Sequence, residues 1–130
     1  MKTRILIIDD QPDFSHWLKR ALESQGYYQV CEENDPLNAV ETARTFGPDL
    51  IVLDVMMPQM DGSEVASQFE REPLLAGIPI LFLTALVGGR EAPAGVCLSG
   101  GRTFLPKTVP LPKLIACIDR QTRELEVLSA

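Results

Sequence analysis

The sequence predicts an α/β protein in which a five-stranded parallel sheet is covered by helices on both faces. Short apolar stretches typical of buried strands alternate with stretches whose apolar residues recur at helical spacing, and this alternation repeats five times. Such an order favours right-handed crossovers, in which a helix connects each strand to the next parallel strand. No repeat or low-complexity segment interrupts the pattern, so residues 1–130 are expected to form one domain.

The first half of the chain is expected to supply three strands and two helices. The first helix begins near Pro12, at a position where a missing backbone N–H costs nothing, and it ends near Gly26. The second helix has Asp35 as its N-cap and Pro36 as its first residue, and Gly47 stops it. Apolar stretches predict strands at residues 4–8, 28–32 and 50–53.

The second half begins with a loop over residues 56–62 that Pro and Gly punctuate. A helix that contains Val65 and Phe69 follows this loop. The final helix is amphipathic and runs from Leu111 to about Leu125. Two further strands are predicted at residues 78–83 and 102–105.

Residues 87–101, where a further helix would complete the alternation, do not suit an ordinary helix. They contain five glycines and Pro93, and each glycine in a helix interior costs about 1 kcal/mol relative to alanine. A helix could begin no earlier than about Glu91, and Gly100 could end it. We therefore expect the fourth helix to be short and irregular, or absent.

Composition excludes several classes of function. The net charge is −6 and no cluster of Lys and Arg occurs, so binding to nucleic acid or to an anionic membrane surface is not expected. No apolar stretch approaches the roughly 20 residues of a membrane helix. Cys31, Cys97 and Cys117 are odd in number and widely spaced, which favours reduced thiols in a cytoplasmic protein.

Polar side chains follow four of the five predicted strands. Asp9 and Asp10 follow the first, Asp54 the third, Thr84 the fourth and Lys107 the fifth. Since ligands bind at the carboxyl ends of the strands in such a sheet, these residues are expected to form one site. Any single acid at a strand end is most simply a solvated residue, but this combination favours a functional site.

The three carboxylates predict a Mg²⁺ site. Two carboxylates about 4 Å apart repel by on the order of 4 kcal/mol at an effective dielectric near 20, and a hard cation would offset this. Asp10 and Asp54 are expected to ligate the ion directly and Asp9 through water. The backbone carbonyl of Met56 is close enough in sequence to add a ligand.

Asp54 is also the candidate nucleophile, because a carboxylate can form an acyl phosphate. The Thr84 hydroxyl and the Lys107 ammonium would hold the phosphoryl oxygens. Phosphoryl transfer needs little beyond such positioning and charge neutralisation.

The sequence resembles the receiver domain of two-component response regulators over essentially its whole length. The resemblance rests on four segments with family-like spacing, namely Ile7-Ile8-Asp9-Asp10, Leu53-Asp54-Val55-Met56-Met57-Pro58-Gln59-Met60-Asp61-Gly62, Leu83-Thr84-Ala85 and Phe104-Leu105-Pro106-Lys107. It implies a flavodoxin-like sheet with strand order 2-1-3-4-5. It also implies phosphorylation by a histidine kinase or phosphotransfer protein, no reaction beyond the domain's own phosphorylation and dephosphorylation, and a switch in which Thr84 and Phe104 move to signal to a protein target.

Some residues depart from the family pattern. In the family, the lysine that matches Lys107 is usually followed by proline, often through a cis bond, whereas Thr108 follows it here. The Lys107–Thr108 bond is therefore expected to be either trans with a rebuilt loop, or cis and strained. Gln11 stands where an acid is common. Met56 and Leu86 are the residues two beyond Asp54 and two beyond Thr84, and neither can activate water, which predicts a long-lived phosphoryl group.

Two other readings of the sequence remain open. The chain could be a receiver-like interaction module that signals without phosphate, which would suit Thr108 and the irregular 87–101 stretch. An aspartyl phosphatase or phosphotransferase is disfavoured because Met56 cannot act as the general acid that such enzymes carry two residues after the nucleophile.

The sequence leaves the position of Trp17 and the partners of the domain open. Trp17 lies either at the edge of the core or on a face that docks a kinase. Neither the cognate kinase nor the target follows from the sequence, nor whether the domain stands alone.

Overall fold

The computed structural model describes residues 2–85, 97–99 and 102–129 of the chain. The helices are α1 (Pro12–Glu23), α2 (Ala39–Phe46), α3 (Gly62–Glu70) and α4 (Leu111–Ser129), with a 3-10 turn η1 (Pro36–Asn38) before α2. The strands are β1 (Thr3–Ile8), β2 (Tyr28–Glu33), β3 (Leu50–Asp54), β4 (Ile80–Thr84), β5 (Cys97–Ser99) and β6 (Arg102–Pro106).

The strands form one sheet in the order β2-β1-β3-β4-β6-β5. The first five of these pair in parallel, which confirms the predicted five-stranded parallel sheet and its 2-1-3-4-5 order, with β6 as the fifth predicted strand. The short β5 was not predicted, and it pairs antiparallel with β6 at the edge of the sheet.

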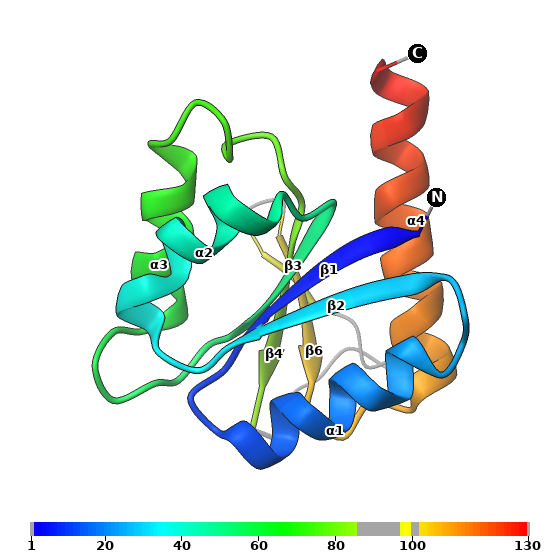
Figure 1. Ribbon diagram of the computed structural model, residues 1–130, viewed down its shortest axis with the longest axis horizontal. Coiled ribbons are helices and arrows are strands. Elements are labelled where there is room, and N and C mark those ends of the chain that lie inside the picture. Colours follow the sequence, from blue (N-terminus) through cyan, green and yellow to red (C-terminus); the bar gives the residue numbers. More distant parts are fainter. Residues whose placement is uncertain (1, 86–96, 100–101, 130) are drawn as a thin grey trace.

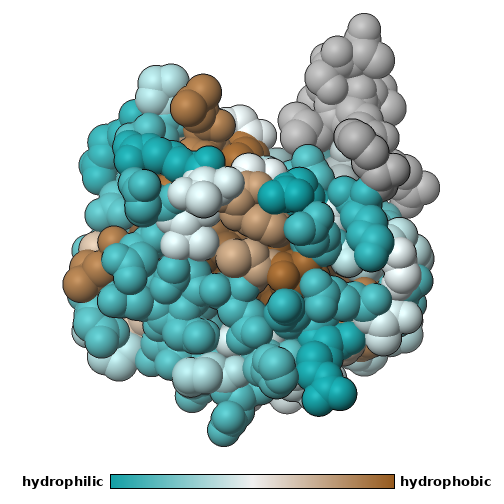
Figure 2. Space-filling view, in the orientation of Figure 1, coloured by the Kyte–Doolittle hydropathy of each residue, from teal (hydrophilic) through white to brown (hydrophobic). Residues whose placement is uncertain are grey.

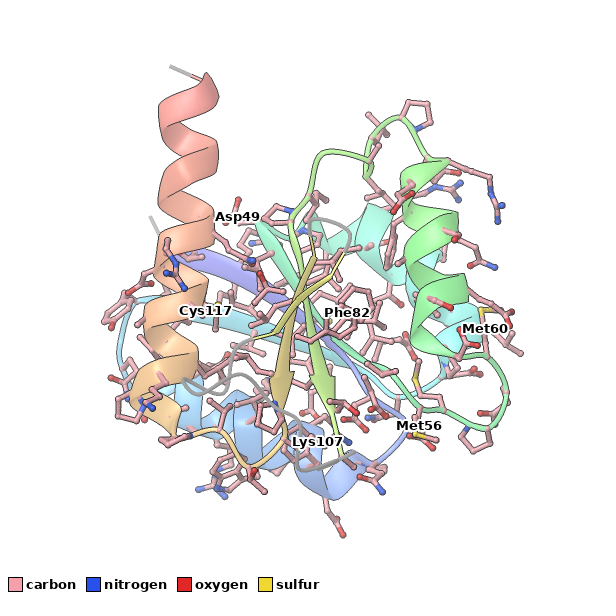
Figure 3. The ribbon with its side chains drawn as sticks, turned by 180° about the vertical axis from the view of Figure 1, so that it is seen from behind. Asp49, Met56, Met60, Phe82, Lys107 and Cys117 are labelled. Carbon is pink, nitrogen blue, oxygen red and sulfur yellow. The ribbon has the colours of Figure 1, made fainter. Side chains whose placement is uncertain are left out.

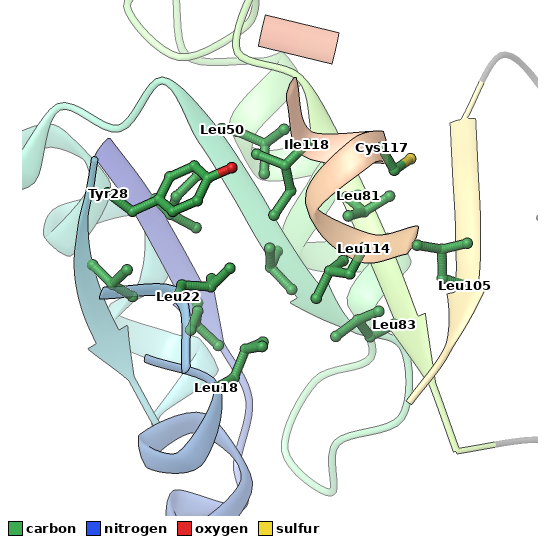
Figure 4. Close-up of a cluster of buried hydrophobic side chains, with 14 residues drawn as sticks. Leu18, Leu22, Tyr28, Leu50, Leu81, Leu83, Leu105, Leu114, Cys117 and Ile118 are labelled. Atoms are coloured by element: carbon green, nitrogen blue, oxygen red, sulfur yellow. The ribbon is translucent and has the colours of Figure 1, made fainter. Parts of the chain in front are cut away.

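Helices cover both faces of the sheet, as predicted (Figure 1). On one face, leucines of α1 and α4 pack against the strands in a cluster that includes Leu18, Leu22 and Leu114 (Figure 4). On the other face, Val65 and Phe69 of α3 pack with buried alanines of α2. Because both faces are covered, the middle strands are largely apolar, and all five residues of β3, including Asp54 at its end, are buried.

Most predicted strand boundaries differ from the structure by one or two residues, and two of the helices differ in how they begin or end. The second helix begins as the turn η1, although Asp35 caps it as predicted by accepting a hydrogen bond from the Leu37 N–H. β4 begins at Ile80 because the N–H of Ile78 is used in a turn to the Leu75 carbonyl and Pro79 has no N–H to donate. The final helix continues to Ser129 rather than ending near Leu125.

The predicted fourth helix between Glu91 and Gly100 falls largely outside the described residues. Its last part is described, and there Cys97–Ser99 forms a strand. A helix that continues to Gly100 is therefore excluded, because these residues pair with β6 instead. A two-turn helix in this glycine-rich stretch would be only marginally stable, whereas the pairing with β6 holds these residues as a strand.

The surface seen in Figure 2 is largely hydrophilic, with hydrophobic side chains in a few separate groups. Within the described part of the chain, no helix has the length and apolar character that a membrane crossing requires.

Candidate functional site

The predicted site residues converge at the carboxyl ends of the parallel strands. Asp9 follows the last residue of β1, Asp54 and Thr84 are the last residues of β3 and β4, and Lys107 follows β6. Lys107 and Met56 lie at the same end of the molecule in Figure 3. The parallel register brings together residues that are far apart in the sequence, because the five parallel strands end at the same edge of the sheet.

Three carboxylates form the centre of this site. One oxygen from each of Asp9, Asp10 and Asp54 lies within 4.8 Å of the other two. Asp9 and Asp54 are 2% and 3% exposed, whereas Asp10 is half-buried. The donors are all hard oxygen atoms, and such a set fits Mg²⁺, which binds a few carboxylates and retains several waters.

Burial and like charge shift the ionisation of Asp54. Its removal from water raises its pKa to about 6, and the Asp9 carboxylate adds to the increase. The Lys107 ammonium and the Met56 N–H act in the opposite direction without cancelling the shift. The described residues therefore do not fully compensate the negative charge of Asp54, which a bound divalent cation would do.

Lys107 brings a positive charge to the site. Its Nζ lies 2.8 Å from Asp9 Oδ2 and 3.6 Å from Asp54 Oδ1, and its side chain is 12% exposed. The described residues contain no cis peptide bond, so the Lys107–Thr108 bond is trans. Lys107 still reaches the carboxylates because its backbone N–H donates to the Thr84 carbonyl at 2.8 Å and thereby continues the strand pairing past β6.

Met56 and Thr84 lie beside Asp54, but their predicted roles remain predictions. The Met56 N–H points to Asp54 Oδ1 at 3.4 Å, and the Met56 side chain is 57% exposed. Thr84 is half-buried at the end of β4, one residue beyond Leu83, which is the register partner of Asp54. Phe104 of β6 stacks on Phe82 of β4 with ring centroids 4.6 Å apart and an angle of 14°.

Two polar residues that sequence reasoning missed hold Asp9 in place. The Asn34 side-chain amide donates to the Asp9 carbonyl at 2.8 Å and to the Ser15 hydroxyl at 2.8 Å. Ser15 is fully buried, and its hydroxyl donates to Glu32 at 2.8 Å. The N–H of Gln11 donates to Asp9 Oδ1 at 2.9 Å. Neither Asn34 nor Ser15 stands in a motif, so no local signal in the sequence identifies them.

Gly62 is the third residue whose role was missed. Its N–H donates to the Val55 carbonyl at 2.8 Å, which joins the start of α3 to the residue that follows Asp54. Asp61 caps the same helix by accepting a hydrogen bond from the Glu64 N–H at 3.0 Å. The Asp-Gly pair at residues 61–62 thus fixes the loop that leaves Asp54.

Curated relatives of the chain are response regulators. It is 39% identical over 116 residues to the response regulator MprA of Mycobacterium ulcerans, covering 89% of this chain and 48% of MprA. It is 36% identical over 123 residues to the response regulator PleD of Caulobacter vibrioides, covering 95% of this chain and 27% of PleD. The chain thus spans about half of the one relative and about a quarter of the other.

Solved structures lead to the same family. A response regulator from Desulfuromonas acetoxidans superposes with a TM-score of 0.76 at 26% identity, covering 95% of this chain and 98% of that one. The signal receiver domain of a DNA-binding response regulator from Colwellia psychrerythraea has a TM-score of 0.74 at 25% identity, covering 94% and 99%. The family model for the response regulator receiver domain matches residues 5–119. The chain therefore belongs to the response regulator receiver domains of two-component systems.

Proposed function

We propose that this receiver domain accepts a phosphoryl group on Asp54 from a histidine kinase or phosphotransfer protein, depends on Mg²⁺, and signals to a protein target by a conformational switch. The observation that supports this most directly is the placement of Asp54. Its buried carboxylate lies within reach of two other carboxylates and of the Lys107 ammonium at the edge where the strands end.

The metal would be held by the carboxylates of Asp10 and Asp54, with Asp9 acting through water and the Met56 carbonyl as a further ligand. When bound, Mg²⁺ supplies charge neutralisation for the transferring phosphoryl oxygens. The raised pKa of Asp54 supports this proposal, because burial and the Asp9 carboxylate disfavour the charge of Asp54 more than its described partners favour it.

In the transfer step, an Asp54 carboxylate oxygen attacks the phosphorus atom of a phosphohistidine. The new O–P bond forms as the P–N bond breaks, and the imidazole nitrogen leaves with the electron pair. The Lys107 ammonium and the Thr84 hydroxyl would hold the phosphoryl oxygens. Hydrolysis of the acyl phosphate by water returns the carboxylate and inorganic phosphate. We propose that the domain catalyses only these two reactions, both on itself.

The switch would use Thr84 and Phe104. Thr84 ends β4 one residue beyond Leu83, the register partner of Asp54, so a phosphoryl group on Asp54 would draw the Thr84 hydroxyl inward. Thr84 pairs with Pro106 of β6, two residues beyond Phe104. A movement of the β4 end would therefore pass to the residues around Phe104, and we propose that its ring then changes rotamer.

The kinase or phosphotransfer partner would dock on α1. Trp17 lies on this helix and is 56% exposed, which favours a surface role over a place in the core. A hollow beside Trp17 is lined by Pro12, Asp13, His16, Arg20, Ala21 and Glu32.

The location and the excluded partners follow from composition. We expect the domain to act in the cytoplasm, because Cys31 and Cys117 are free thiols. We expect it to bind neither nucleic acid nor membrane itself, because its net charge is −6.

Intact-mass spectrometry after treatment with a small phosphodonor tests this proposal. Wild-type protein with Mg²⁺ should gain one phosphoryl group, and chelation of the metal or an Asp10→Asn substitution should slow the gain strongly. Asp54→Asn should gain none. Stoichiometric labelling of Asp54→Asn would refute Asp54 as the acceptor, and an unlabelled wild type would favour an interaction module that works without phosphate.

A further inference from the structure

The ammonium of Lys107 has two neutral partners in addition to its carboxylate partners. Its Nζ lies 4.7 Å from the centroid of the Phe14 ring, over the ring face. It also donates a hydrogen bond to the side-chain oxygen of Gln11 at 3.2 Å. Both residues belong to the start of α1, where Gln11 is the N-cap and Phe14 lies in the first turn. Lys107 is therefore held at its backbone by Thr84 of β4 and at its charged end by the start of α1.

The carboxylates and the neutral groups differ in what else they are needed for. The Asp9 oxygen at 2.8 Å and the Asp54 oxygen at 3.6 Å from Nζ belong to the cluster that suits a divalent cation. A cation at that cluster competes with the ammonium for these oxygens and repels it as a like charge. The Phe14 ring offers no ligand atom to a hard cation, and the uncharged Gln11 oxygen attracts such a cation less than a carboxylate does.

We propose that Phe14 and Gln11 are positioning residues that keep the Lys107 ammonium beside Asp54 when a divalent cation draws on the Asp9 and Asp54 carboxylates. This inference rests on the proposed function of Asp54 and deepens it. Lysine is a compact charge on a flexible stem, so without such partners its ammonium would move away from the cation into solvent.

Phe14 is itself fixed in place. It is half-buried against the hydrophobic cluster that includes Leu18 and Leu114, and its ring centroid lies 6.0 Å from that of Trp17. A ring in this position could serve the core alone, so the test must separate packing from the contact with the charge. Phe14→Leu keeps an apolar side chain and removes the ring face, whereas Phe14→Tyr keeps both.

The first measurement does not depend on phosphorylation. The ε-methylene protons of Lys107, observed by NMR in lysine-labelled protein, should be shifted upfield by the Phe14 ring and should show a nuclear Overhauser effect to it. Both signals should persist at saturating Mg²⁺ in the wild type and in Phe14→Tyr. Loss of both signals on addition of Mg²⁺ to the wild type would overturn the proposal.

The second measurement is the rate of phosphorylation by a small phosphodonor at saturating Mg²⁺. Phe14→Leu should be slower by about fivefold, the size expected for a partly buried cation–π contact, and Phe14→Tyr should retain most of the rate. Gln11→Met, which keeps the length of the side chain and removes its oxygen, should be slowed less. In a Lys107→Ala background, Phe14→Leu should have no further effect.

The outcomes distinguish this inference from the proposed function. An equal loss from Phe14→Leu with and without Lys107 would mean that Phe14 acts through packing, and a wild-type rate in Phe14→Leu would mean that it does not act; either result refutes the positioning role. Labelling of Asp54→Asn would instead refute the acceptor, and the NMR measurement would still decide whether the ring holds the ammonium.

Discussion

Gly62 lies directly against the backbone of Asp54. A Cβ atom at position 62 would lie 2.5 Å from the Asp54 carbonyl oxygen and 3.0 Å from the Cα atom of Val55. Real Cβ atoms do not approach a backbone oxygen so closely, and neither neighbour can rotate away as a side chain could. The start of α3 can therefore take this position only because residue 62 is glycine.

A Gly62→Ala substitution should for this reason destabilise the domain and displace Asp54. The backbone must shift to admit the methyl group, and such overpacking costs about 1–3 kcal/mol. Urea unfolding should show this loss in the free energy of unfolding. The phosphorylation rate with a small phosphodonor should fall as well.

The matched control is Gly77→Ala. Nothing lies within 4 Å of a Cβ atom at Gly77, which is exposed. The same substitution there should be neutral or stabilising by up to about 1 kcal/mol, because alanine restricts the unfolded chain. Equal destabilisation by both substitutions would remove the contact with Asp54 as the cause.

Asp54→Asn should stabilise the metal-free domain at neutral pH. The native pKa of Asp54 is raised from 3.8 to about 6 by burial and by Asp9, so the native state binds more protons than the unfolded state between these values. The contribution of Asp54 to stability therefore falls as the pH rises from about 4 to about 6, and the loss is complete at pH 7.5. At about 1.4 kcal/mol per pKa unit, Asn should gain at most about 3 kcal/mol there and almost nothing near pH 4.

Thermal and urea unfolding in a chelator, at several pH values, would measure this difference. Asp61→Asn is the control of opposite sign, because hydrogen bonds from the Ser63 hydroxyl and the Glu64 N–H lower the pKa of Asp61. At pH values above the ordinary pKa of an aspartate, the Asp61→Asn variant should be less stable than the wild type. A stabilisation by Asp54→Asn that does not change between pH 4 and 7.5 would show that the charge of Asp54 is not its source.

The parts of this fold that sequence reasoning found have a local signal. Asp9 and Asp54 directly follow buried aliphatic stretches, so the end of a strand and its polar residue are visible together. The helix faces are visible in the same way, since Leu18 and Leu22 recur at helical spacing and are both buried. The parallel topology then brings the strand ends to one edge.

The parts that were missed depend on pairings that only the folded chain creates. Asn34 reaches Asp9 across the sheet edge, and Phe14 reaches Lys107 from another element, although neither residue stands out among its neighbours. β5 has three residues among glycines, which is too short for a period of two to be recognised. Its partner β6, and not its own sequence, determines its conformation.

Met56→Asn should shorten the lifetime of the phosphoryl group. The Met56 side chain is 57% exposed and belongs to the residue whose N–H faces Asp54 Oδ1, so it lies where a water could approach Asp54. An amide can orient that water and a thioether cannot. We expect dephosphorylation to accelerate by at least about threefold, and by more when Leu86→Glu is added. The measurement is the loss of the phosphoprotein mass after the donor is removed.

The control is Leu74→Asn, because Leu74 is an apolar residue that is 81% exposed in the connection to β4. This substitution should leave the rate of dephosphorylation unchanged. An unchanged decay in Met56→Asn would contradict the proposed path of the water.

Phe104 should report the phosphorylated state. Its ring is half-buried and stacks on Phe82 at 4.6 Å, and a stacked pair of this kind is worth about 0.5–1.5 kcal/mol beyond its buried area. With fluorine-labelled phenylalanine, the Phe104 resonance should move on phosphorylation, whereas that of Phe69, which is 1% exposed in α3, should not.

Phe82→Leu removes the stacking partner of Phe104, so the rotamer of the unphosphorylated protein loses its preferred contact. In the unphosphorylated variant, the Phe104 resonance should therefore move part of the way towards its position in the phosphorylated protein. If the Phe104 resonance stays in place on phosphorylation while Asp54 is fully modified, its ring does not take part in the switch, and Thr84 must transmit the signal through other residues of β4 and β6.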